Sequence, residues 1–146
     1  MEKKDPIIIV GGGIGGLAAA RALALKGYHS IVLEQASEFN EIGAGIQLGP
    51  NVDRMFHRLN VAEAMHDLAF YPQNIIMLDG IAAEEVTRVP LGNAFRDHFG
   101  NPYGVIHRAD LHKVLLEACQ SMSEIKLQAG MEVIGYEDDG TAVTVK

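Results

Sequence analysis

The segment from Ile7 to Glu34 constrains the fold more than any other part of the chain. Its first four residues are apolar, and they precede a glycine run with the pattern G-x-G-x-x-G at Gly11, Gly13 and Gly16. Residues 17–26 are rich in alanine and leucine, and a second apolar run at 31–33 ends on an acid. This order predicts a strand, a tight turn, a helix and a second strand, which together form a βαβ unit that binds a dinucleotide.

The glycines have separate physical tasks in such a unit. Gly11 allows a sharp turn out of the strand, Gly13 lets a pyrophosphate approach the backbone, and Gly16 lets the helix pack closely on the sheet. The helix N-terminus presents unpaired N–H groups and the positive end of the helix dipole to the phosphates. The candidate cofactor-binding residues of this turn are Gly11, Gly13, Ile14, Gly15 and Gly16.

Glu34 ends the second strand, where dinucleotide sites carry an acidic residue. Its carboxylate can accept hydrogen bonds from both ribose hydroxyls. The negative charge also repels a 2′-phosphate, which disfavours NADP in this site. The alternative is a glycine-rich turn with a surface glutamate, but the two flanking apolar runs favour the nucleotide site.

Composition and charge exclude several other classes of protein. The net charge of −7 and the absence of a basic cluster argue against a nucleic-acid surface. The one cysteine, Cys119, cannot form an internal disulfide, which fits a cytoplasmic protein. The chain begins with Met1 and reaches only four apolar residues before the glycines. We therefore expect a true N-terminus, no signal peptide and no membrane span.

The reactive side chains do not form a recognisable catalytic or metal motif. His107 and His112 are five residues apart around a helix start and do not share a face, so no metal pair is expected. Cys119 lies beside an apolar helix stripe and is interpreted as a packed thiol. We assign no metal ligand and no catalytic residue.

The remaining pattern predicts an α/β fold whose parallel sheet gains its third strand late. Residues 43–51 are rich in glycine and are interpreted as an extended loop, either flexible or lying against something flat. The expected elements are helices at 14–26, 51–59 (capped by Asn51), 61–68 and 109–122, a hairpin of strands 75–78 and 85–89, a third parallel strand at 125–128, and a C-terminal hairpin of strands 132–136 and 141–145. Residues 90–103 are expected to be irregular.

Three stretches of the sequence resemble flavin-dependent aromatic hydroxylases of the para-hydroxybenzoate hydroxylase fold. They are Ile7–Gly16 with Glu34-Gln35, the segment EIGAGIQLGPN at 41–51, and the segment PYGVIHRADLH at 102–112. The segments PQNI at 72–75 and AEEV at 83–86 are similar to the branch of 3-hydroxybenzoate 6-hydroxylases and salicylate hydroxylases. The resemblance covers essentially the whole chain.

The resemblance implies that FAD, and not NAD, occupies the glycine site. It implies pyrophosphate contacts from the backbone near Gly15 and Gly16 and a ribose contact from Glu34. By the same resemblance Gln35 lies beside the adenine-side ribose, Gly45 and Ile46 lie against the isoalloxazine, Arg108 reaches the phosphate or ribityl chain, and the Met131 backbone touches adenine. A guanidinium beside a pyrophosphate is physically reasonable, although a solvated arginine at a helix start is the alternative for Arg108.

The family pattern also implies that the chain is an N-terminal part of an FAD-binding domain. The later flavin motifs and the sheet that covers the aromatic substrate are absent from residues 1–146, and residues 70–105 are interpreted as an excursion toward the substrate region. The implied whole protein is a monooxygenase that uses NADH or NADPH, O2 and a phenolic acid, with a homo-oligomer as the candidate assembly. This fragment alone is expected to be inactive.

Two other functions remain open. Another FAD-dependent oxidoreductase could share this N-terminus, and a non-catalytic module could bind FAD or NAD as a sensor. An NAD dehydrogenase domain is disfavoured by the late third strand.

Overall fold

The computed structural model describes residues 5–40 and 43–146. The expectations for Met1 to Lys4 and for Glu41 and Ile42 lie outside the described residues. The chain divides into two compact units, and each is described by itself. Unit 1 consists of residues 1–42 and 111–146, and unit 2 consists of residues 43–110.

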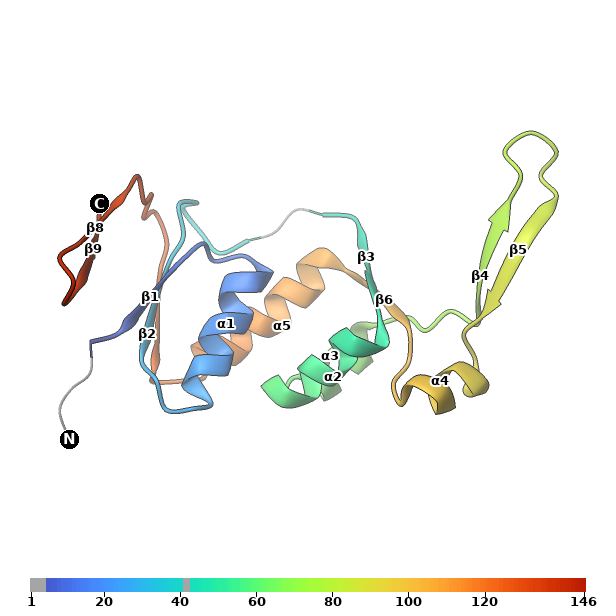
Figure 1. Cartoon of the computed structure of the whole chain (residues 1–146), viewed down its shortest axis with the longest axis horizontal. Helices are drawn as coiled ribbons and strands as arrows, with labels where there is room; N and C mark the ends of the chain where they lie inside the picture. The colour runs from blue at the N-terminus through green and yellow to red at the C-terminus, as the bar shows by residue number, and fades with distance from the viewer. Residues whose placement is uncertain (1–4, 41–42) are drawn as a thin grey trace. The chain divides into compact units, whose positions relative to one another are not determined.

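Unit 1 is built on a three-stranded parallel sheet with the order β1-β2-β7 (Figure 1). Its elements are β1 (Ile7–Val10), α1 (Ile14–Ala24), β2 (Ser30–Leu33), most of α5 (Arg108–Gln120), β7 (Ile125–Gln128), β8 (Tyr136–Asp138) and β9 (Val143–Val145). The parallel pairing of β2 with β7 confirms the late third strand. The antiparallel pair β8–β9 confirms the C-terminal hairpin. However, β8 overlaps the expected strand 132–136 only at Tyr136, and β9 is shorter than the expected strand 141–145.

The core of unit 1 lies where α1 and α5 bury their small and branched residues. Leu17, Ala20, Val32 and Cys119 have no exposed surface, and Leu115 has almost none. Cys119 donates from Sγ to the Leu17 carbonyl oxygen at 3.3 Å, and burial raises the pKa of the thiol to about 11. A thiol with such a pKa is not a nucleophile at neutral pH, in agreement with the packed thiol expected from the sequence.

Unit 2 contains two antiparallel strand pairs and three helices. Its elements are β3 (Gly45–Leu48), α2 (Pro50–Leu59), α3 (Ala62–Leu68), β4 (Asn74–Leu78), β5 (Glu85–Pro90), α4 (Asn93–Phe99) and β6 (Gly104–His107), which leads into α5. β4 pairs with β5, which confirms the inserted hairpin, and β3 pairs with β6.

The structure corrects three expectations in unit 2. Residues 45–48 form a strand and not a loop, because β6, some sixty residues later, supplies the hydrogen-bonding partner. Residues 93–99 form the helix α4, where irregular chain was expected. Asn51 does not cap α2: the N-cap is Gly49, with Pro50 at the start of the helix, where a missing N–H costs nothing.

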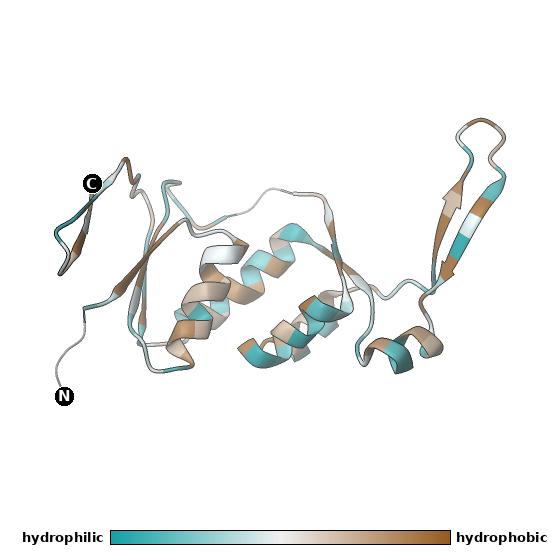
Figure 2. Ribbon diagram, in the orientation of Figure 1, coloured by the Kyte–Doolittle hydropathy of each residue, from teal (hydrophilic) through white to brown (hydrophobic). Residues whose placement is uncertain are grey.

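The β4–β5 hairpin exposes apolar side chains. Figure 2 shows hydrophobic residues along both strands, and Ile76, Met77 and Val86 are each at least 44% exposed, while Ile81 at the tip is 99% exposed. Exposed apolar strands are prone to association. We expect the isolated chain to be unstable or to self-associate, with sedimentation that depends on concentration. A monomer with a sharp thermal transition that is independent of concentration would contradict this expectation.

Candidate FAD site

The glycine turn has the geometry that the pattern predicts. Gly11 has φ +101°, in the left-handed region that favours glycine, and its N–H donates to the Leu33 carbonyl oxygen at 2.8 Å. A Cβ at Gly16 would lie 1.9 Å from the Gly11 carbonyl oxygen. The helix therefore approaches the turn more closely than any side chain at residue 16 would allow.

The N-terminus of α1 is open toward the space in front of the turn. Gly13 is the N-cap residue, and the first intrahelical bond runs from the Leu17 N–H to the Gly13 carbonyl oxygen at 3.0 Å. The N–H groups of Ile14, Gly15 and Gly16 precede this bond and have no acceptor within the helix. A Cβ at Gly13 or Gly15 would meet no atom within 4 Å. This combination of donors and free space fits the pyrophosphate of a dinucleotide.

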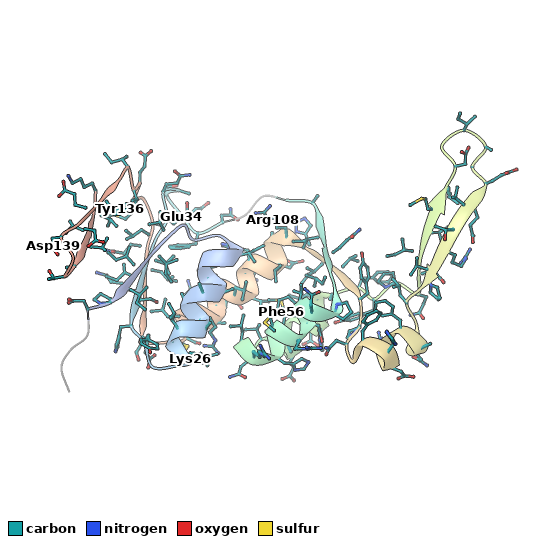
Figure 3. All side chains as sticks on the ribbon, viewed as in Figure 1. Lys26, Glu34, Phe56, Arg108, Tyr136 and Asp139 are labelled. Carbon is teal, nitrogen blue, oxygen red and sulfur yellow. The ribbon has the colours of Figure 1, made fainter. Side chains whose placement is uncertain are left out.

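Glu34 is fixed at the end of β2, where Figure 3 labels it. The Gly12 N–H donates to its Oε2 at 2.6 Å, and the Ala36 N–H donates to its Oε1 at 2.9 Å. These two backbone donors, Ala36 first, lower the pKa of the Glu34 carboxyl below its usual value. The side chain is therefore a carboxylate at neutral pH, and its remaining lone pairs can accept from ribose hydroxyls.

The lowered pKa of Glu34 predicts a pH-dependent contribution to stability. Because the folded-state pKa lies below the unfolded value of about 4.5, the carboxylate stabilises the fold above that pH. The contribution is lost as pH falls further through the folded-state pKa. Partial exposure limits its size to about 1 kcal/mol or less.

Urea unfolding from pH 7 to pH 3 checks this prediction. Glu34→Gln should have a lower midpoint than the wild type at pH 7, and the difference should shrink below about pH 4.5. A difference of constant size at all these pH values would show that the carboxylate charge is irrelevant to the fold.

Two residues that restrain the turn, Gly12 within it and His112 on α5, were not predicted from the sequence. Gly12 is buried, and a Cβ there would lie 2.3 Å from Cε1 of Phe39 and 3.1 Å from Cβ of Glu34. His112, only 3% exposed, places Nε2 2.9 Å from the Gly12 carbonyl oxygen. Two features of the sequence could have indicated these residues. Gly12 is the middle one of three consecutive glycines, at a position that the pattern G-x-G-x-x-G leaves open, and His112 follows Leu111 in the buried stripe of α5.

The adenine-side candidates lie beside Glu34. The Met131 N–H donates to the Glu34 carbonyl oxygen at 2.8 Å, and the Gly130 N–H donates to the Ala36 carbonyl oxygen at 2.7 Å. The chain after β7 therefore runs along the end of β2. Gln35 is exposed at the same end. The contacts of Gln35 and Met131 with a nucleotide remain predictions.

The three candidates of unit 2 are brought together by the β3–β6 pair. Gly45 pairs with His107, Ile46 pairs with Ile106, and the N–H of Arg108 donates to the Ala44 carbonyl oxygen at 3.2 Å. A Cβ at Gly43 would lie 2.9 Å from Cβ and Cδ of Arg108. The glycine-rich strand thus lies against the exposed Arg108, labelled in Figure 3. Their flavin contacts remain predictions.

A second polar cluster, which sequence analysis also missed, joins α2 to α3. Asp53 is 5% exposed; its Oδ1 is 2.6 Å from Nε2 of His66, and its Oδ2 is 3.6 Å from Nε2 of His57. With its amide nitrogen turned toward Asp53, Asn101 donates to Oδ2 at 3.1 Å. Asp53, His57 and His66 could together hold a metal ion. However, two ligand atoms bound to one zinc ion by bonds of about 2 Å lie farther apart than the 2.6 Å between Oδ1 of Asp53 and Nε2 of His66. We therefore interpret this contact as a hydrogen bond.

The Asp53–His66 hydrogen bond should stabilise unit 2. We expect His66→Ala to lower the free energy of unfolding by about 1–3 kcal/mol, because it leaves a buried carboxylate with one donor fewer. His57→Ala is the matched control: His57 is 59% exposed and farther from Asp53, so its loss should cost about 0.5 kcal/mol or less. Urea denaturation of the two variants checks this, and equal effects would contradict it.

Residues 5–40 and 43–146 include no helix long and apolar enough to cross a membrane.

The family comparison agrees with the geometry of the glycine turn. Residues 4–146 match the FAD binding domain family, so the chain belongs to this family and its cofactor is FAD. It is 47% identical over 140 residues to the 3-hydroxybenzoate 6-hydroxylase of Polaromonas naphthalenivorans, covering 96% of this chain and 35% of that protein. It is 43% identical to the 3-hydroxybenzoate 6-hydroxylase of Klebsiella oxytoca, covering 99% and 36%.

Solved structures show the same fold. p-Nitrophenol 4-monooxygenase PnpA of Pseudomonas putida superposes with a TM-score of 0.89 at 19% identity, covering 99% of this chain and 36% of that one. HpxO of Klebsiella pneumoniae, solved with FAD and uric acid, has a TM-score of 0.82 at 27% identity, with the same coverage. The chain thus spans about a third of the length of these relatives and has the α/β fold of the FAD part of flavoprotein monooxygenases.

Proposed function

We propose that the whole protein is an NAD(P)H-dependent flavoprotein monooxygenase that hydroxylates a phenolic aromatic acid such as 3-hydroxybenzoate or salicylate. The observation that supports this most is the 47% identity to a 3-hydroxybenzoate 6-hydroxylase over 96% of the chain, combined with a complete glycine turn. We propose a cytoplasmic location, with no nucleic-acid or membrane partner. A homo-oligomer is compatible with the tetrameric form of 2-methyl-3-hydroxypyridine-5-carboxylic acid oxygenase among the fold relatives.

In this proposal the residues of unit 1 hold the ADP half of FAD. The N–H groups of Ile14, Gly15 and Gly16 bind the pyrophosphate at the start of α1, and Glu34 accepts from the ribose. Gln35 and the Met131 backbone border the adenine side. The bound flavin supplies the redox chemistry with reduced nicotinamide and O2.

In this proposal unit 2 contributes the glycine-rich strand β3 and the guanidinium of Arg108. Gly45 and Ile46 offer a flat backbone surface to the isoalloxazine, and Arg108 neutralises a phosphate or holds the ribityl chain. A guanidinium suits this role because it is always charged and presents several donors in one plane. No residue of the chain is proposed as an acid or base in hydroxylation.

Enzyme turnover by the full-length protein tests the proposal. The FAD-loaded protein is mixed with NADH or NADPH and with 3-hydroxybenzoate, salicylate or benzoate. We expect a hydroxylated acid to accelerate nicotinamide oxidation and to gain one oxygen atom by mass spectrometry, while benzoate, which lacks the ring hydroxyl, is not hydroxylated. Nicotinamide oxidation that no phenolic acid accelerates would favour another FAD-dependent oxidoreductase. Selective binding of NAD over FAD would favour a non-catalytic nucleotide module.

A further inference from the structure

We propose that His112 is a positioning residue for FAD, because it fixes the Gly12–Gly13 peptide so that the Gly13 N–H faces the pyrophosphate. The proposal rests on the FAD site of the proposed function and assigns to it a residue outside the glycine pattern. The two groups that carry it, Nε2 of His112 and the carbonyl of Gly12, are separated by 100 positions in the sequence and by 2.9 Å in space.

The direction of the hydrogen bond follows from its acceptor. A carbonyl oxygen can only accept, so Nε2 of His112 carries the proton and donates to Gly12. Both residues are buried, with His112 only 3% exposed, so this bond is sheltered from competing water. Without His112, the Gly12 carbonyl would lose its donor inside the core.

Fixing this carbonyl also fixes the next N–H group. The carbonyl of Gly12 and the N–H of Gly13 belong to the same peptide plane, and the described residues contain no cis peptide bond. In a trans peptide the C=O and N–H bonds point in opposite directions. A carbonyl directed toward His112 therefore directs the Gly13 N–H away from His112. A Cβ at Gly13 would meet no atom within 4 Å, so there is free space beside this residue.

The peptide between Gly11 and Gly12 is fixed by Glu34. The Gly12 N–H donates to Oε2 of Glu34 at 2.6 Å. Gly12 is thus held by His112 through its carbonyl and by Glu34 through its N–H, and both polar groups are engaged inside the protein. Glycine residues have wide conformational freedom, so a run of three needs such external restraints to present one conformation to a ligand. Preorganised donors bind an anion without the cost of ordering them.

Three variants of the full-length protein separate a positioning role of His112 from a packing role. His112→Leu removes the donor and keeps an apolar side chain, and His112→Gln keeps a side-chain N–H donor of similar reach. His107→Leu, at an exposed strand residue, is the control. FAD affinity is measured by flavin fluorescence, and fold stability by urea denaturation. We expect His112→Leu to weaken FAD binding about tenfold or more, and His112→Gln and His107→Leu to bind within about threefold of wild type.

Competition with ADP and adenosine shows whether the effect lies at the phosphates. If His112 acts through the Gly13 N–H, His112→Leu should weaken competition by ADP and leave competition by adenosine unchanged. Equal weakening of both competitors would mean a structural role only and would overturn the proposal. If FAD binds the wild type and His112→Leu equally well, the positioning role fails and the proposed function stands. If the wild type binds no FAD, both fail.

Amide spectra of the wild type provide a test that does not depend on the folding of a variant. We expect the ¹⁵N–¹H resonance of Gly13 to shift when ADP is added and not when adenosine is added. We also expect a slowly exchanging Nε2 proton on His112. An unshifted Gly13 resonance at saturating ADP, or a His112 ring protonated only at Nδ1, would contradict the proposal.

Discussion

Replacing Gly16 with alanine is expected to destabilise the fold by about 3 kcal/mol or more, which is a large fraction of the free energy of unfolding of a typical domain. The new methyl group would lie 1.9 Å from the Gly11 carbonyl oxygen and 3.4 Å from Cγ2 of Ile9. The first of these is a backbone atom in a turn, so it cannot move without opening the contact between α1 and β1. The expected result is a large fall in the urea midpoint, together with loss of FAD binding.

Gly15 provides the matched control for this substitution. It is the neighbouring residue of the same helix, and a Cβ there would meet no atom within 4 Å. Gly15→Ala should leave stability unchanged or raise it by up to about 1 kcal/mol, because alanine has the higher helix propensity. If the two variants lose similar amounts of unfolding free energy, α1 does not approach the turn as closely as described.

Replacing Gly13 with alanine is expected to separate binding from folding. Gly13 has φ −73°, which any residue can adopt, and its Cβ position is open. The free energy of unfolding should therefore stay within about 0.5 kcal/mol of wild type. The methyl group would occupy the space of the pyrophosphate and keep it from the N–H groups of α1. Loss of charge-assisted hydrogen bonds worth about 2–3 kcal/mol corresponds to FAD affinity weaker by about a hundredfold.

Flavin fluorescence and urea denaturation check this prediction together. Gly80→Ala, in the open turn between β4 and β5, is the control and should change neither quantity. Unchanged FAD affinity in Gly13→Ala would place the pyrophosphate elsewhere. A stability loss as large as that of Gly16→Ala would show that the space in front of Gly13 is filled.

An element of this fold could be predicted from the sequence where the interactions that define it are local. Ile7–Glu34 could be assigned because each requirement of the nucleotide turn is local: a left-handed residue at Gly11, a close approach at Gly16 and an acid at the end of the next strand. The Asp139-Gly140 turn marked the C-terminal hairpin for the same reason.

The elements that were missed depend on distant partners. The strand Gly45–Leu48 exists because Gly104–His107 pairs with it, and glycine-rich residues alone favour a loop. Asn51 is of a residue type that often caps helices, but the N-cap of α2 is Gly49, two residues earlier, and Pro50 is the first residue of the helix. The bond between His112 and Gly12 spans 100 positions, and no local pattern indicates it.

A binding titration of the full-length protein decides whether the glycine turn of unit 1 holds FAD through its ADP half. FAD and NAD are titrated separately, and ADP is used as a competitor of FAD. We expect FAD to bind with micromolar affinity, ADP to displace it, and NAD to bind more weakly. Selective NAD binding, or FAD binding that ADP does not displace, would contradict this expectation.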